Sequence, residues 1–168
     1  MKEIIKRDKY FKYIEKFIWK DVIKVIIWQR RVGKSYILLQ VLDYLKNIWV
    51  SDNKIVYINK EDVKFDFLRI YKDLYEYCKN YDYVLVDEIQ EIKDWEKAVR
   101  TFQIEWKDIY ITGSNLKLLS GELATFLSGR YISIQIYPLD YREFLKFHNL
   151  RKWKNLLKNI LNMDECLI

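Results

Sequence analysis

Short apolar runs alternate with helical patterns along most of this chain, and this alternation constrains the fold more than any other feature. The strand-like runs span residues 22–27, 55–59, 83–87, 108–112 and 131–136. Between them, apolar residues recur at the three- and four-residue spacing of helices. Strands that alternate with helices favour a parallel sheet covered on both faces. The sequence therefore predicts an α/β fold with five parallel strands and a functional site at their carboxyl ends.

The helical patterns define the rest of the organisation. Helices are expected over residues 9–19, 36–49, 65–78, 95–102 and 116–128. A last stretch, 141–161, keeps its apolar residues near one face and its lysines and arginines outside that face. We interpret this stretch as a helix packed on the core with a solvated basic face, and a DNA-contacting surface is the weaker alternative.

Composition excludes several classes of protein. A chain of 168 residues that is 51% hydrophobic and 17% aromatic forms one core and is not disordered. No apolar run approaches the ~20 residues of a membrane-spanning helix, and the charged N-terminus lacks a secretory signal. Cys78 and Cys166 have no metal-ligand spacing, which favours a reducing cytoplasm. The net charge of +6 supports a nucleic-acid partner only weakly, because acidic residues are interleaved with the basic ones.

Gly33 is one of only four glycines, and Gly33-Lys34-Ser35 joins the first apolar run to a helical pattern. Backbone N–H groups at a helix N-terminus form an anion site. In such a loop Lys34 would reach the β- and γ-phosphates, and Ser35 would ligate Mg²⁺. A buried strand and helix without such a role is the weaker alternative.

Trp28 departs from the pattern G-x-x-x-x-G-K-[ST], which has glycine at that position. A large side chain disfavours the positive φ and close packing often found there, at a cost of roughly 1–3 kcal/mol. Trp28 is therefore expected to strain or reshape the loop.

Residues 83–87 form a short apolar run that ends in adjacent carboxylates, Asp87 and Glu88. Asp87 would hold Mg²⁺ through Ser35 and water, and Glu88 would polarise the water that attacks a phosphate. Two solvated acids after a buried strand are an equal alternative for this run alone. The phosphate loop upstream favours the catalytic interpretation.

Three further polar residues are candidates. Ser114 and Asn115 come shortly after the run 108–112. At this place a polar side chain would contact the γ-phosphate or the attacking water, and the alternative is that it caps the next helix. Arg130 stands between a helical pattern and the last run. It is a surface charge by default, and the alternative is an arginine finger that supplies charge to a neighbour's γ-phosphate.

Together these motifs resemble the AAA+-type ATPases of archaea and bacteria. More narrowly, they resemble predicted ATPases whose core precedes a poorly characterised C-terminal region often likened to a restriction-nuclease fold. The resemblance spans about residues 5–148 and lies in these segments: Arg30–Ser35, Tyr57–Asn59, Leu85–Gln90, Trp95–Glu96, Ile111–Asn115, Ser128–Arg130 and Pro138–Leu145.

The resemblance implies a three-layer P-loop NTPase fold that binds ATP and Mg²⁺ in the cytoplasm. It assigns the nucleotide loop (Walker A) to Arg30, Arg31, Val32, Gly33, Lys34, Ser35 and Tyr36. It places Walker B at Asp87 and Glu88, a sensor at Ser114 or Asn115, and a finger at Arg130 in a homo-oligomer. It divides the chain into an N-terminal helix (1–20), a P-loop core (21–138) and the start of a truncated lid (139–168).

Two hypotheses for the function follow. In the first, the chain binds Mg·ATP and hydrolyses it slowly, acting on a substrate that no motif identifies. In the second, Trp28 closes the phosphate loop, and the domain is a non-catalytic interaction or nucleic-acid-binding module. The intact Lys34, Ser35 and Glu88 favour the first hypothesis.

Overall fold

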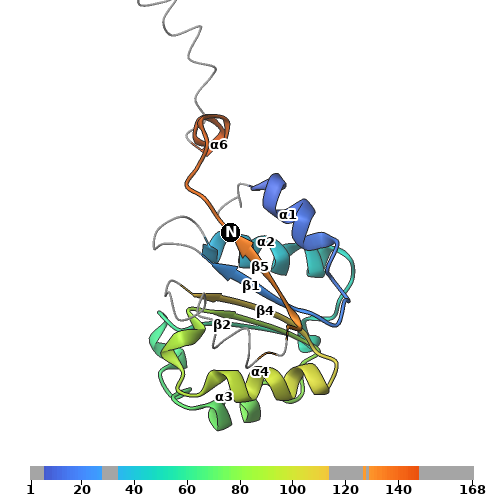
Figure 1. The fold of residues 1–168 in the computed structure, drawn as a ribbon, viewed down its shortest axis with the longest axis vertical. Helices are drawn as coiled ribbons and strands as arrows, with labels where there is room; N and C mark the ends of the chain where they lie inside the picture. The colour runs from blue at the N-terminus through green and yellow to red at the C-terminus, as the bar shows by residue number, and fades with distance from the viewer. Residues whose placement is uncertain (1–5, 28–33, 114–126, 128, 148–168) are drawn as a thin grey trace, which may run out of the picture. The chain divides into compact units, whose positions relative to one another are not determined.

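The computed structural model describes residues 6–27, 34–113, 127 and 129–147 (Figure 1). Its centre is a five-stranded parallel sheet in the order β2-β3-β4-β1-β5. The strands are β1 (Ile23–Ile27), β2 (Ile55–Asn59), β3 (Tyr83–Asp87), β4 (Asp108–Gly113) and β5 (Tyr131–Gln135). The predicted parallel α/β sheet is therefore confirmed, with strand bounds within one residue of those expected.

The described α-helices are α1 (Asp8–Glu15), α2 (Lys34–Asn47), α3 (Tyr71–Cys78), α4 (Trp95–Ile104) and α6 (Tyr141–Phe147). Short 3₁₀ turns are η1 (Asp52–Lys54), η2 (Val63–Phe65) and η3 (Ile89–Glu91). The chain divides into two compact units, residues 6–137 and residues 1–5 with 138–168. Helix α6 belongs to the second unit, and the sheet belongs to the first.

Two expected helices are shorter than the sequence pattern indicates. The first ends at Glu15 rather than residue 19; residues 16–19 form turns, and Trp19 adopts a left-handed conformation with φ 65°. The helix expected from residue 65 begins only at Tyr71. The backbone N–H groups of residues 69 and 70 donate to the Asp73 carboxylate instead, and such local bonds compete with a helix. The helix expected over 116–128 falls almost wholly outside the described residues, as does the chain after 147.

Each face of the sheet has its own apolar core. Residues of α1 and α2 pack on one face with Ile26, Tyr83, Leu85 and Tyr110. Helices α3 and α4 cover the other face, as Figure 1 shows. Because side chains alternate along a strand, this division tells which face each strand residue occupies.

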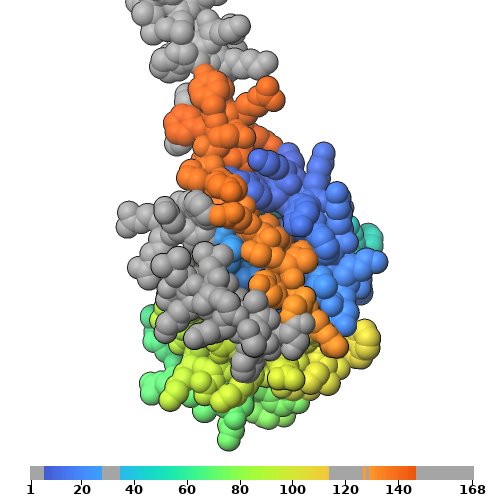
Figure 2. Space-filling view, in the orientation of Figure 1, coloured from blue at the N-terminus to red at the C-terminus, as the bar shows by residue number. Residues whose placement is uncertain are grey.

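Strand β5 is the outermost strand on one side of the sheet, next to β1, and it is partly exposed. Figure 2 shows it (orange) at the surface, beside α1 (blue). The Tyr10 hydroxyl on α1 accepts a 3.0 Å hydrogen bond from the Tyr137 N–H just past β5. The buried Arg7 donates to the Tyr137 carbonyl at 2.8 Å, so α1 is tied to the chain that leaves the sheet edge.

The strand order positions the functional site. Strand β4 lies between β3 and β1, although β1 is followed in sequence by β2. The carboxyl ends of β3, β4 and β1 are consequently neighbours at one edge of the sheet. Ligands of open α/β sheets bind at this edge, where the strand order reverses.

Candidate active site

Asp87 and Thr112 meet at the carboxyl-terminal edge of the sheet. Asp87 is the last residue of β3, and Thr112 is near the end of the adjacent β4. Both share the α2 face, because Leu85 and Tyr110, two residues earlier, belong to the core on that face. The Thr112 hydroxyl donates a short hydrogen bond to Asp87 Oδ1. Asp87 is 1% exposed, so its carboxylate is held in a fixed, nearly dry position.

Glu88 follows Asp87 in a left-handed conformation, with φ 54° and ψ 51°. This conformation costs a non-glycine residue about 1–2 kcal/mol and is concentrated at functional sites. The Glu88 N–H donates to Thr112 Oγ1 at 3.1 Å, so Thr112 bonds to both acidic residues. Glu88 is only half-buried and is accessible where Asp87 is not.

Gln90 bonds to the Glu88 side chain. Its Nε2 donates a short hydrogen bond to Glu88 Oε2. Its Oε1 is buried, and within the described part of the chain it has no hydrogen-bond partner. A buried acceptor of this kind costs roughly 1–3 kcal/mol unless a ligand or water satisfies it. Gln90 therefore orients the carboxylate and offers an acceptor beside it.

Helix α2 packs on the same face of the sheet as Asp87. It begins at Lys34, shortly after β1, and Ser35 is half-buried in its first turn. Asp87 forms no ion pair with any Lys or Arg side chain that the structure describes. A buried carboxylate without a cation favours a bound positive charge.

The residues fit a magnesium ion. Mg²⁺ in nucleotide sites uses one or two protein oxygens and completes its shell with water and phosphate oxygens. Asp87 and Ser35 carry oxygens that would suit such a site. No group of three or more His, Cys, Asp or Glu side chains placed to hold a metal occurs among the described residues.

Tyr57 lies on β2 next to this edge. Burial raises the pKa of its hydroxyl, and the negative charges of Asp87 and Glu61 raise it further. The hydroxyl therefore stays protonated and remains a potential hydrogen-bond donor.

The structure separates Arg130 from the other predicted site residues. Arg130 immediately precedes β5, and its carbonyl accepts a 3.0 Å hydrogen bond from the Ile23 N–H at the start of β1. It therefore lies at the amino-terminal edge of the sheet. A five-residue strand separates this edge from Asp87, which is roughly 16 Å. Arg130 is exposed, and it lies at the end of the sheet opposite Asp87.

Other predicted residues have different outcomes. Tyr36 is exposed in the first turn of α2. Trp28, Arg30, Arg31, Val32, Gly33, Ser114 and Asn115 lie outside the described residues, and their assignments stay predictions.

Sequence reasoning assigned no role to Thr112 or Gln90. A signal for Thr112 was present, because it is a polar residue at the end of an apolar run, the third such run after Gly33-Lys34-Ser35. Its contact with Asp87 depends on β3 and β4 being neighbours, which the sequence pattern does not state. Gln90 lies two residues after Glu88, where a short 3₁₀ turn brings its side chain back.

The chain matches the AAA domain family over residues 20–145, which is most of its length, and it belongs to that family. An uncharacterised protein of Haemophilus influenzae is 39% identical over 172 residues, covering 98% of this chain and 43% of that protein. The uncharacterised protein MJ1544 of Methanocaldococcus jannaschii is 39% identical over 152 residues, covering 88% of this chain and 32% of that protein. The chain thus spans less than half the length of these relatives, which include a bacterial and an archaeal protein.

Solved structures show the same fold at low identity. The replication initiator DnaA bound to AMPPCP and single-stranded DNA has a TM-score of 0.58 and 18% identity, covering 91% of this chain and 54% of that one. A DNA polymerase III gamma subunit-related protein of Thermotoga maritima has a TM-score of 0.58 and 14% identity, covering 88% and 52%. The sheet of this chain therefore has the AAA+ P-loop architecture. None of its described helices is long and apolar enough to cross a membrane.

Proposed function

We propose that this chain is a nucleotide-binding domain that hydrolyses ATP slowly with Mg²⁺. The single observation that supports this most strongly is the arrangement of Asp87, Glu88 and Thr112. At the sheet end beside α2, the Thr112 hydroxyl donates to the buried Asp87 carboxylate, which has no cation partner among the described residues, and accepts from the backbone N–H of the half-buried Glu88. The AMPPCP in the structurally similar DnaA adds support, because it binds to the same fold.

In this proposal the two acidic residues have different roles. Asp87 and Ser35 would hold Mg²⁺, which would supply positive charge to the phosphates. Glu88 accepts a hydrogen bond and then a proton from the attacking water, whose oxygen bonds to the γ-phosphorus. The bond between that phosphorus and the β–γ bridging oxygen breaks, leaving ADP and phosphate. Gln90 keeps the Glu88 carboxylate oriented for this step.

The nucleotide loop is the second part of the proposal. Arg30 to Gly33 supply backbone N–H groups, Lys34 binds the β- and γ-phosphates, and Tyr36 lies beside the loop. Ser114 or Asn115 contacts the γ-phosphate or the water. Arg130 serves the site of a neighbouring copy, which its place at the amino-terminal edge supports. Residues 139–168 begin the lid.

Calorimetric titration of Mg·ATP into the 168-residue chain tests binding, with Lys34→Ala as the control. We expect saturable binding that Lys34→Ala abolishes. Glu88→Gln is the matched variant for chemistry, because it keeps the size and hydrogen-bonding capacity of the side chain. It is expected to bind Mg·ATP normally and to release no phosphate, so measurable turnover in Glu88→Gln would contradict the role of Glu88.

The degenerate domain remains the second candidate, favoured by Trp28 in place of glycine. It predicts no binding of Mg·ATP by the folded protein, and binding that appears in Trp28→Gly. If neither protein binds nucleotide, both candidates fail.

A further inference from the structure

The outer side of strand β5 (Tyr131–Gln135) is open to pairing with another strand. Strand β5 pairs only with β1 among the described strands, and it lies at the surface (Figure 2). Ser133 and Gln135 are exposed. Strand β2, the outermost strand on the other side of the sheet, has buried or half-buried side chains throughout. An exposed edge strand is a template for a further strand.

The backbone of β5 is paired with β1 on one side. The Arg130 carbonyl accepts from the first residue of β1, and the Ile136 N–H donates to the carbonyl of its last residue, each at 3.0 Å. Backbone groups of successive residues in a strand point to opposite sides. Those of residues 131, 133 and 135 therefore point away from β1. Within the described part of the chain, no hydrogen bond occupies these outward groups.

The sequence of β5 has none of the features by which edge strands avoid pairing. Residues 131–136 read Tyr-Ile-Ser-Ile-Gln-Ile and contain no charged residue and no proline. The register with β1 is continuous over all five residues of the strand, without a bulge. Arg130 and Pro138 lie just outside the segment. The outer side can therefore pair along its whole length.

The segment is complementary to itself in the antiparallel direction. About a twofold axis at Ser133, this residue opposes its own copy, Ile132 opposes Ile134, and Tyr131 opposes Gln135. Residues 131, 133 and 135 then all exchange backbone hydrogen bonds with the second copy. The opposed isoleucines form a β-branched pair on the face that α1 and α2 cover. No like charges oppose one another in this register.

We propose that two copies of this chain associate through β5, antiparallel about Ser133, so that one sheet continues across both copies. The unpaired backbone groups require an extended strand as the occupant. A second copy fits because the symmetric register uses every outward group of β5, and a twofold interface of this kind is closed. The paired segment is short, so the association should be weak and depend on concentration.

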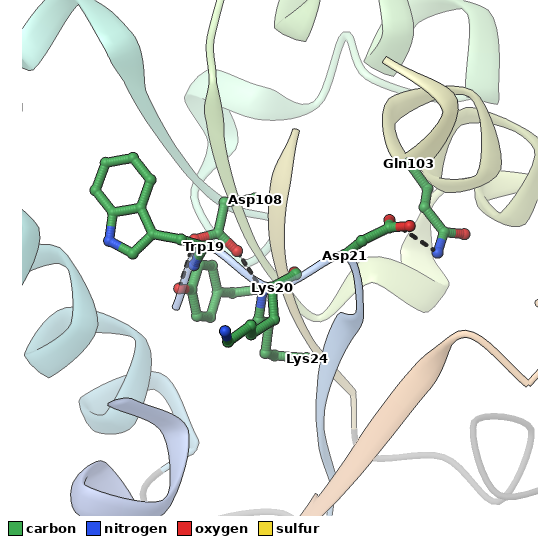
Figure 3. A network of polar contacts seen from close by, with 7 residues as sticks. Trp19, Lys20, Asp21, Lys24, Gln103 and Asp108 are labelled. Carbon is green, nitrogen blue, oxygen red and sulfur yellow. Dashed lines mark hydrogen bonds and ion pairs between the residues drawn. The ribbon is translucent and has the colours of Figure 1, made fainter. Parts of the chain in front are cut away.

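The pairing also changes the surroundings of Arg130, a consequence that rests on the proposed function. Arg130 forms no ion pair with the carboxylates that the structure describes. Asp108, a buried acid at the same end of the sheet, is already paired with Lys24 (Figure 3). In the pair of chains, Arg130 opposes Ile136 of the second copy. It then lies two strand spacings, roughly 10 Å, from the end of that copy's β1, which leads into the proposed nucleotide loop.

Sedimentation velocity of the 168-residue chain, without nucleotide, tests the pairing between about 1 μM and 1 mM, the range of weak complexes. We expect a monomer that becomes a dimer as the concentration rises. Ser133→Lys places two ammonium groups opposite each other and should weaken the dimer about fivefold. A chain that stays monomeric throughout this range would overturn the proposal.

Ser51→Lys is the matched control for added charge. Ser51 is exposed, precedes β2 on the other side of the sheet, and makes no side-chain capping hydrogen bond. We expect its dimer to match that of the unaltered chain. Equal weakening by Ser51→Lys and Ser133→Lys would show a general effect of charge and contradict pairing through β5.

A mixture of Ser133→Lys and Ser133→Glu tests the register. An ammonium and a carboxylate oppose each other only if position 133 of one copy faces position 133 of the other. The mixture should therefore dimerise more strongly than either variant alone. A mixture that associates no better than the separate variants would contradict the twofold register.

Phosphate release separates the pairing from the proposed function. We expect release per chain to rise as the dimer forms, and Arg130→Ala to remove this rise without preventing dimerisation. Release that does not change as the dimer forms would contradict the place given to Arg130. A dimer that binds no Mg·ATP would support the pairing and contradict the proposed function.

Discussion

The amino-terminal and carboxyl-terminal ends of the central sheet each hold a buried aspartate that accepts a hydrogen bond from a hydroxyl group. At each end an aspartate on the α2 face bonds to a hydroxyl group of β4. Asp108 accepts from Tyr110 at the amino-terminal edge, and Asp87 accepts from Thr112 at the carboxyl-terminal edge. Both aspartates are buried.

The two aspartates differ in whether a positively charged side chain is paired with them. Asp108 is paired with the fully buried Lys24, whose ammonium also donates to the Lys20 carbonyl at 3.1 Å. Burial lowers the pKa of Lys24, and Asp108 opposes that shift. Asp87 has no such partner among the described lysines and arginines. A buried charge that the fold neutralises is structural, whereas one left uncompensated favours an external cation.

Replacement of Lys24 by Met should have the largest effect, because it leaves Asp108 as an uncompensated buried charge. We expect the free energy of unfolding to fall by about 3–5 kcal/mol, measured by urea denaturation. The double variant Lys24→Met/Asp108→Asn removes both charges and should recover much of the loss. A single variant as stable as the unaltered chain would remove the contrast between the two ends.

Replacement of Asp87 by Asn should leave the protein folded and inactive. We expect phosphate release to fall by about 10²–10³-fold, since a charge that stabilises the transition state is lost. The melting temperature should stay the same or rise, because the variant removes a buried carboxylate that has no cation partner among the described residues. A large loss of stability would instead make Asp87 structural, as Asp108 is.

Replacement of Thr112 by Val removes the hydroxyl that joins Asp87 to the Glu88 N–H. We expect a loss of about 1–3 kcal/mol in the free energy of unfolding, because a partly buried N–H and the buried Asp87 carboxylate both lose a hydrogen-bond partner. Phosphate release should fall with it. Thr112→Ser keeps the hydroxyl and should restore both properties, whereas equal effects of Val and Ser would assign the loss to packing.

Replacement of Tyr83 by Phe should have the smallest effect at neutral pH, because its hydroxyl has no partner among the described residues. Burial raises the pKa of Tyr83 from 10.0 to about 12, with a contribution from Asp108. Between those values the unfolded chain releases the proton first, so stability falls as pH rises. The phenylalanine variant should therefore lose less stability between pH 10 and pH 12.

The contrast variant is Tyr110→Phe, which removes the hydrogen bond to Asp108. It should cost about 0.5–1.5 kcal/mol already at pH 7, measured by denaturation. An unchanged alkaline slope in Tyr83→Phe would show that other groups, such as the buried Cys78, cause the decline.

The sequence predicted the strands more accurately than the helices. The apolar runs 23–27 and 83–87 are buried on both faces, as continuous apolar strands of a parallel sheet are expected to be. The predicted start of α3 was wrong, because the Asp73 carboxylate accepts hydrogen bonds from the backbone N–H groups of residues 69 and 70. Periodicity does not register such a local bond.

By itself, the sequence determined the parallel α/β class, the place of Asp87 and Glu88 after a buried strand, and the start of a helix at Gly33-Lys34-Ser35. Those features depend on residue spacing along one segment. Only the tertiary structure decided that β4 lies between β3 and β1, which brings Thr112 to Asp87 and leaves Arg130 at the opposite edge. It also paired Lys24 with Asp108, 84 residues apart. Strand order and buried ion pairs depend on long-range contacts that leave no local pattern.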